Sequence, residues 1–251
     1  MFFSVSELVH VYNVRPSGVL HVGAHNAEES SEYQNNNWGH VVWVEAQPDL
    51  VHALKKRLPA RGNSVIEAAV WNESGVKLTF NIASNGESSS LLDLGSHAES
   101  YPSVRYIRSL SISTKRLDEI IPSVQFADFL NMDIQGVELK ALEGLGSRLN
   151  EFKWVYTEVN KSEVYKNCTM IGDLDNYLAR FGFKRVSTRW VIGKGWGDAL
   201  YTNHKVKMSF TQKVKAISGN YKWNYGQMNE KFPIRKKILT IIQNFLHVTK
   251  R

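Results

Sequence analysis

Two acidic side chains follow apolar runs, at positions where a folded chain could use them for chemistry. Asp133 comes directly after "FLNM", and Glu158 comes directly after "WVYT". A carboxylate placed in this way is a candidate general base, or a group that orients a hydroxyl. Together with Asn160 the two acids could also hold Mg²⁺, but acids at strand ends are commonly plain hydrogen-bonding partners. We therefore take Asp133 and Glu158 as the catalytic candidates and do not favour a divalent metal.

A ligand-binding turn is indicated by "GVLHVGAHNAEES", in which an apolar run enters Gly23 and polar residues follow at once. Glu45 ends the run "VVWVE" 22 residues after Gly23, and an acid at about this spacing accepts hydrogen bonds from both hydroxyls of an adenosine ribose. Ala24, His25 and Ala27 stand where a dinucleotide fold has further glycines, and the P-loop pattern is missing. The turn favours an adenosine ligand without phosphates, and S-adenosylmethionine is such a ligand.

Short apolar runs alternate with amphipathic segments along the chain, which is typical of βαβ units. The expected strands are 18–23, 40–46, 63–71, 76–83, 128–132 and 153–160. The expected helices are a polar one that ends at Tyr33, then 48–58, 114–121, 137–145 and 171–182. "FKRVSTRWVI" and "DALYTN" form a closing hairpin around 193–197. The pattern predicts an α/β fold whose mostly parallel sheet is covered on both faces and carries an antiparallel hairpin at one edge.

The amino-acid composition and the charge limit the classes of protein to which this chain can belong. A chain of 251 residues with 43% hydrophobic residues is suited to one α/β domain, and its single cysteine, Cys168, excludes a disulfide framework. The net charge of +7 is uneven, because residues 203–251 hold eleven Lys or Arg and one acid, whereas residues 1–202 hold 20 Lys or Arg and 23 acids. The mildly acidic body argues against nucleic acid as a partner. Without a long apolar run or a signal-peptide pattern at the start, a cytoplasmic protein is expected.

The ordered segments "LHVGAHNAEE", "VVWVEAQPDL", "EAAVWNESG", "SSSLLD", "TKRLDEII", "DFLNMDIQGVELKALEGL", "WVYTEVN" and "DALYTN" resemble the FkbM family of S-adenosylmethionine-dependent methyltransferases. The resemblance covers roughly residues 17–203. It implies a Rossmann-like class I methyltransferase fold with a seven-stranded sheet, and O-methylation of a sugar or small metabolite. His21, His25 and Ala27 depart from the commoner family pattern of Asp, Asn and Gly.

By this resemblance, the cofactor contacts fall on three stretches of the chain. His21, Gly23, Ala24 and His25 would lie along the methionine moiety, and a carboxylate of Glu28 or Glu29 would face its ammonium or sulfonium. The adenine would lie against Ala46, Ala69 and Val70, and Ser90 is a weaker candidate for a cofactor or substrate contact. Other readings stay open: His21 as a core histidine, His25 and Glu28 as a hydrogen-bonded pair, and the three small or apolar residues as plain packing.

The expected reaction is methyl transfer to a hydroxyl of a sugar or glycan, with Asp133 as its base, as a hydroxyl-orienting group, or as a partner of the cofactor amine. Asn/Asp-Pro-Pro-Tyr, which marks many amino-methyltransferases, is missing from "DIQG". The alternatives are a small non-sugar acceptor, a non-catalytic interaction protein on the same fold, and, by fold alone, a dehydrogenase.

The expected boundaries are a methyltransferase domain over 1–203 and a basic helical extension over 204–251. In "PIRKKILTIIQNFLHVTKR" apolar residues recur at helical spacing between basic ends. Such a helix could pack on the body, form a homodimer, or lie on an anionic membrane surface.

Overall fold

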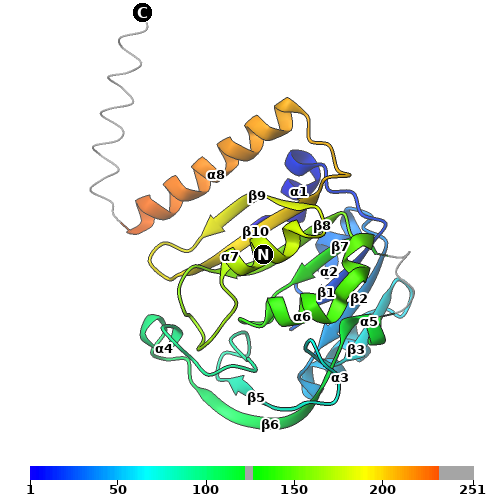
Figure 1. Cartoon of the computed structure of the whole chain (residues 1–251), viewed down its shortest axis with the longest axis vertical. Helices are drawn as coiled ribbons and strands as arrows, with labels where there is room; N and C mark the ends of the chain where they lie inside the picture. The colour runs from blue at the N-terminus through cyan, green and yellow to red at the C-terminus, as the bar shows by residue number, and fades with distance from the viewer. Residues whose placement is uncertain (122–126, 232–251) are drawn as a thin grey trace, which may run out of the picture.

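A seven-stranded sheet forms the centre of the molecule, in a computed structural model that describes residues 1–121 and 127–231 (Figure 1). Its spatial order is β3-β2-β1-β7-β8-β10-β9. The pairs from β3 to β8 are parallel, and β10 runs antiparallel to both of its neighbours. The strands are β1 (Gly18–Val22), β2 (His40–Glu45), β3 (Asn63–Glu67), β7 (Phe129–Met132), β8 (Trp154–Asn160), β9 (Phe183–Trp190) and β10 (Trp196–Asn203). The predicted Rossmann-like class I methyltransferase architecture, with its edge hairpin, is confirmed.

Helices cover both faces of this sheet, because alternate strand residues point to opposite sides. Leu20 and Val42 belong to the core beneath α6 (Glu138–Leu145) and α7 (Ile171–Ala179), followed by a 3₁₀ turn at Gly146–Glu151. Val19 and Trp43 belong to the opposite core. That second core contains residues of α1 (Val5–Tyr12), α2 (Ser30–Asn35), α3 (Pro48–Arg57) and α8 (Phe210–Lys231).

A second, three-stranded sheet was not predicted. It consists of β4 (Ala69–Val70), β6 (Tyr106–Lys115) and β5 (Lys77–Ala83), in that order. The predicted strand 63–71 is divided between the two sheets at Ala68. The predicted helix 114–121 is wrong at its start, because β6 pairs with β4 and β5 as far as Lys115, and only α5 (Leu117–Ile120) is helical. Most of β6 is exposed, so its sequence lacks a clear apolar signal.

The helix expected directly after Gly23 begins later. His25 and Ala27 have positive φ angles of 43° and 48°, which an α-helix does not accommodate, and α2 starts at Ser30. Residues 24–29 therefore form a series of tight turns. The backbone N–H groups near Gly23 belong to these turns and not to the first turn of a helix.

The amino-terminal segment and α8 pack together at one edge of the molecule. Trp223 of α8 lies 5.1 Å from the ring of Phe2. The guanidinium of Arg189, on β9, lies between the rings of Phe3 and Trp223, at 4.1 and 5.2 Å, and pairs with Glu7. The extension therefore contacts the body along α8. The amphipathic stretch 233–251 lies outside the described residues.

Across the described ranges, no helix is both long enough and apolar enough to span a bilayer.

Candidate functional site

Two adjoining cavities open at the carboxyl ends of the parallel strands. The wider one has a volume of about 440 Å³ and the narrower one about 70 Å³. Five residues line both cavities and mark the place where they meet: Gly23, His25, Glu87, Asp133 and Gln135. In an α/β sheet this edge is the usual place for a ligand.

Gly23 brings the ends of β1 and β7 into contact. Its φ is +86°, and a Cβ at this position would lie 1.8 Å from the backbone oxygen of Asp133. Its N–H donates to the carbonyl of Val44 at 2.9 Å, which also fixes the turn against β2. Only glycine satisfies both the backbone angle and the close approach. The turn residue expected from the sequence is thus essential to the shape of the junction.

Glu45 lines the narrower cavity from the end of β2. Its carboxylate accepts hydrogen bonds from the backbone N–H groups of His25 and Gln47, both at 2.8 Å. Burial raises the pKa of this carboxyl group, and these hydrogen bonds act in the opposite direction. They explain why an acid is tolerated here without a ligand. Each oxygen still has a second lone pair with which to accept a hydroxyl.

Part of the narrower cavity is apolar. Ala46, Ala69 and Val70 line it as expected, together with Phe80 and Leu91. Small side chains and an aromatic ring in one lining are suited to an aromatic base. Phe80 and Leu91 come from the second sheet and the loop after it, which the sequence did not associate with this site.

His21 lies in the opposite core but reaches the wider cavity. Its Nδ1 is 3.2 Å from the Tyr33 hydroxyl and 3.3 Å from the side-chain nitrogen of Asn131, and its ring lies 4.7 Å from that of Trp43. Burial lowers the pKa of His21, which favours the neutral ring. His21 is therefore a hydrogen-bonded core histidine, as one interpretation of the sequence had it. It also contributes to the cavity wall, as the other interpretation requires.

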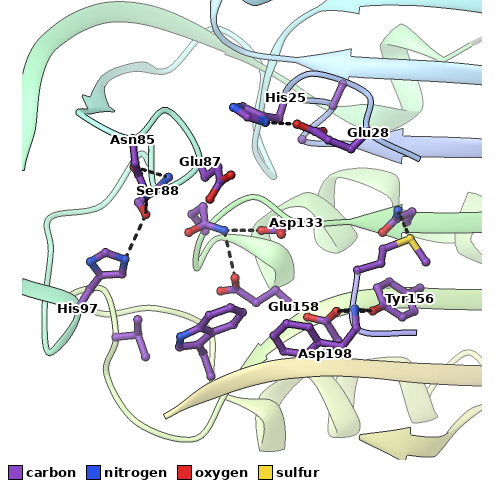
Figure 2. A pocket seen from close by; sticks show the side chains of 18 of the residues that line it. His25, Glu28, Asn85, Glu87, Ser88, His97, Asp133, Tyr156, Glu158 and Asp198 are labelled. Carbon is purple, nitrogen blue, oxygen red and sulfur yellow. Dashed lines mark hydrogen bonds and ion pairs between the residues drawn. The ribbon is translucent and has the colours of Figure 1, made fainter. Parts of the chain in front are cut away.

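The turn after Gly23 supplies four further wall residues. Ala24, His25, Glu28 and Glu29 all line the wider cavity. The His25 ring nitrogen Nδ1 lies 2.7 Å from Oε1 of Glu28, so the hydrogen-bonded pair considered from the sequence is present (Figure 2). The pair stands at the cavity and not in the core, and its role toward a ligand stays a prediction.

Asp133 and Glu158 meet as their positions predicted. The residues before them, Met132 and Thr157, are register partners on neighbouring parallel strands, so both carboxylates reach the same space (Figure 2). A residue that the sequence did not suggest joins them. The side-chain nitrogen of Gln135 donates to Oδ1 of Asp133 and, at 3.1 Å, to Oε2 of Glu158. Gln135 is itself held by a hydrogen bond from the Tyr165 hydroxyl to its side-chain oxygen.

The two catalytic candidates differ in their surroundings. Asp133 is accessible from the cavity, but its confined position and the nearby charge of Asp198 raise its pKa to about 6. Glu158 is only 4% exposed, and Oε1 has no hydrogen-bond partner among the described residues. Burial and the like charge of Asp133 raise the pKa of Glu158 well above its ordinary value. The pair thus places a carboxyl group whose pKa is about 6 beside one in which burial favours the neutral form.

Neighbouring acids support this geometry. Asp198, across from Glu158 in the register of β10 and β8, accepts hydrogen bonds from the Tyr156 hydroxyl and, at 2.7 Å, from the Phe2 N–H. Burial raises the pKa of Asp198. Glu138 accepts from the N–H of Gly136 at 3.0 Å and anchors the turn that carries Gln135.

Two residues expected near the site are placed elsewhere. Ser90 lines neither cavity, because its hydroxyl donates to the carbonyl of Gln135 at 2.8 Å and accepts from the N–H of Leu92 at 3.0 Å. Its neighbours Ser88 and Ser89 line the wider and the narrower cavity. Asn160 is fully buried outside both linings. The described part of the chain contains no cluster of three His, Cys, Asp or Glu arranged to hold a metal ion.

Comparison with known proteins places this site in a family. Residues 21–185 match the model of the "Methyltransferase FkbM domain". The chain is 26% identical over 200 residues to the 2-O-methyltransferase NoeI of Sinorhizobium fredii (strain NBRC 101917 / NGR234), an alignment that covers 75% of this chain and 80% of that one. A more distant likeness is to a Streptococcus agalactiae structure described as a protein of the NADB-Rossmann superfamily, with 13% identity, a TM-score of 0.47, and coverage of 93% and 83% of the two chains. The family match spans most of the chain, including every strand from β2 to β8, and the protein therefore belongs to the FkbM methyltransferase family.

Proposed function

We propose that the protein is an S-adenosylmethionine-dependent O-methyltransferase that acts on a hydroxyl of a sugar or glycan. The observation that carries the proposal is the pair of joined cavities with Asp133 at their junction. One cavity suits an adenosine, the other has room for a methionine chain and an acceptor, and a base stands between them.

The narrower cavity would hold the adenosine. The apolar residues of its lining, Ala69 and Phe80 among them, would contact the adenine, and Glu45 has lone pairs left for the ribose hydroxyls. The methionine chain would then pass Gly23 into the wider cavity, where the carboxylates of Glu28 and Glu29 face a cationic group. When bound, the cofactor supplies an electrophilic methyl group, whose bond to sulfur breaks with the electron pair remaining on sulfur as the acceptor oxygen bonds to carbon.

Asp133 would take the proton of the acceptor hydroxyl. With a pKa of about 6, this carboxyl group is mostly ionised at neutral pH and is still basic enough to assist proton removal. Glu158, in which burial favours the neutral form, would exchange a hydrogen bond with a second hydroxyl of the acceptor. Gln135 positions both carboxyl groups by donating to each. Most of the remaining catalytic effect would come from aligning the oxygen with the methyl group and sulfur.

The choice of a hydroxyl acceptor has support from the 2-O-methyltransferase NoeI, to which the chain is similar. A small non-sugar hydroxyl compound is the second candidate, because the wider cavity has room for one beside a methionine chain.

The test is methyl transfer from labelled S-adenosylmethionine to a panel of neutral glycans and, in parallel, to non-sugar alcohols and phenols. Mass spectrometry and NMR would locate the new methyl group. We expect a methyl ether on a sugar hydroxyl. Transfer only to nitrogen, or only to non-sugar alcohols, would contradict the proposed acceptor. Failure of the protein to bind S-adenosylhomocysteine in calorimetry would contradict the proposed cofactor.

A further inference from the structure

The wider cavity is lined by carboxyl groups, which we call its acidic side, and by aromatic rings, which we call its aromatic side. The two groups adjoin, since Trp196 and Asp198 lie two residues apart on β10. Six carboxyl side chains line the cavity: Glu28, Glu29, Glu87, Asp133, Glu158 and Asp198. Three of them, Glu87, Asp133 and Glu158, point toward the same central space (Figure 2). Several groups that pair with this acidic side are neutral: the Gln135 amide, the Tyr156 hydroxyl and the Phe2 N–H. The α-amine of Met1 lies 3.5 Å from Glu29.

Glu158 shows that the acidic side is built to meet a ligand. Its side chain is only 4% exposed and lines the cavity, while Oε1 has no hydrogen-bond partner among the described residues. Leaving a buried polar atom unpaired costs stability, and a ligand hydroxyl in this cavity would supply the missing partner. A sugar hydroxyl, which both donates and accepts, suits either protonation state of this carboxyl group.

A continuous series of rings forms the aromatic side. The Phe2 ring lies 5.3 Å from that of Trp196, whose indole N–H donates to the Tyr101 hydroxyl at 3.3 Å. His97 follows, 4.9 Å from the Tyr101 ring and 5.5 Å from that of Tyr165. All five residues line the wider cavity. His97 and Tyr165 are buried, whereas Phe2, Tyr101 and Trp196 are only partly buried. The rings of these three residues suit the flat C–H face of a sugar, whose hydroxyls would then reach the acids.

From these two sides we infer that the acceptor is a sugar unit without phosphate, carboxylate or sulfate, stacked on the aromatic side and hydrogen-bonded to the acidic side. The inference rests on the proposed function and narrows it, because it favours a neutral or amine-bearing glycan unit over a sugar phosphate or a uronic acid. An anionic group brought into this cavity would lie near the carboxylates of Glu87 and Asp133, which the cofactor does not neutralise, and such like-charge contacts are strongly unfavourable.

The test compares acceptors that differ in charge. The full chain is assayed by kcat/KM with three pairs: glucose and glucose 6-phosphate, N-acetylglucosamine and its 6-phosphate, and galactose and galacturonate. We expect the neutral member of a pair to be preferred by about tenfold or more. Glu87→Lys should reduce this preference several-fold, because it reverses one charge of the acidic side. Glu73→Lys makes the same charge change at an exposed position outside both cavities and should leave the preference unaltered.

Equal or better transfer to the anionic members would overturn the inference and leave the proposed O-methylation of sugars in place. If Glu87→Lys does not reduce the preference for neutral sugars, the electrostatic basis of the inference is wrong. Transfer to none of the six sugars, and to no member of the glycan panel, by a protein that binds S-adenosylhomocysteine would instead remove the sugar acceptor, and with it both proposals. S-adenosylhomocysteine affinity, measured for each variant, shows that the fold and the cofactor site are intact.

Discussion

The side-chain nitrogen of Gln135 lies 3.1 Å from Oε2 of Glu158 and donates a hydrogen bond to it. The same nitrogen donates to Asp133, so one neutral amide links the two candidate catalytic carboxyl groups. Gln135 has a φ of +56°, an uncommon backbone conformation for a residue other than glycine, and the turn is anchored by Glu138. Gln135 is therefore a positioning residue, and its loss should change both the rate of the reaction and its dependence on pH.

Replacing Gln135 by Leu should lower kcat by about 10- to 100-fold, because the two carboxyl groups lose their alignment. The hydrogen bond from Gln135 lowers the pKa of Asp133, which lies near 6. Its loss makes the charged form less favourable, so the pKa of Asp133 rises. Activity that requires ionised Asp133 should therefore decline at a higher pH in the variant than in the wild type. A pH profile of kcat that only drops in height, without moving, would contradict the assigned role.

Neutralising Asp198 should have the opposite effect on the pH profile. The charge of Asp198 raises the pKa of Asp133, second only to burial. In Asp198→Asn the ionised form of Asp133 becomes more favourable, its pKa falls, and activity should persist to lower pH. Glu151→Gln is the matched control, because Glu151 lies on the 3₁₀ turn outside both cavities and pairs with Arg148. A shift of the pH profile to higher pH, the direction expected for Gln135→Leu, would show that the pKa of Asp133 does not govern the decline of activity at low pH.

Glu45→Ala should weaken S-adenosylmethionine binding by roughly 1.5–3 kcal/mol, the range for hydrogen bonds to a charged group. The carboxylate also fixes the backbone of His25 and Gln47, so part of the loss would come from a looser turn. Glu67→Ala is the control, because Glu67 is the exposed register partner of Glu45 on β3. Calorimetry that gives equal affinities for both variants and the wild type would remove Glu45 from the cofactor site.

Arg189→Ala should lower the free energy of unfolding by about 2–3 kcal/mol, because it breaks a buried, hydrogen-bonded ion pair. Arg189 donates to Glu7 at 2.6 and 2.9 Å and to the Phe2 carbonyl at 2.6 Å, and Trp223 covers it. The pair of Arg108 and Asp49 is exposed, so Arg108→Ala should change stability by less than about 1 kcal/mol. Urea denaturation of both variants checks the difference. Similar losses would show that α8 and the amino-terminal segment are not held by Arg189.

Much of the fold was predictable because buried parallel strands appear in the sequence as short, continuous runs of apolar residues. Runs such as "VVWVE" are apolar on both faces, since helices cover the sheet on both sides. Strand β6 has no such run of apolar residues, because it lies mostly exposed in a small sheet. The end of this strand was therefore assigned to a helix. Turn chemistry was also missed: the positive φ angles of His25 and Ala27 delay α2 until Ser30.

The candidate site was partly predictable for a similar reason. Gly23, Glu45, Asp133 and Glu158 stand at strand ends, and the parallel sheet brings such positions together. Gln135 and the aromatic side of the wider cavity depend on long-range contacts, as between Tyr165 and Gln135 or Phe2 and Trp196. Spacing in the sequence holds no information on these contacts. Ser90 shows the same limit, since its hydroxyl is used by the Gln135 carbonyl and its neighbours reach the cavities.

The central claim is that Asp133 removes the acceptor proton during methyl transfer, and its most direct test is the turnover of Asp133→Asn with the acceptor found in the glycan screen. This substitution keeps the shape of the side chain but removes its charge and basicity. We expect kcat to fall by about 10²–10⁴-fold. The affinity for S-adenosylhomocysteine should change little. Turnover near the wild-type rate would contradict the claim. A loss of S-adenosylhomocysteine affinity as large as the loss of kcat would also contradict it, because Asp133 would then be holding the cofactor and not acting as the base.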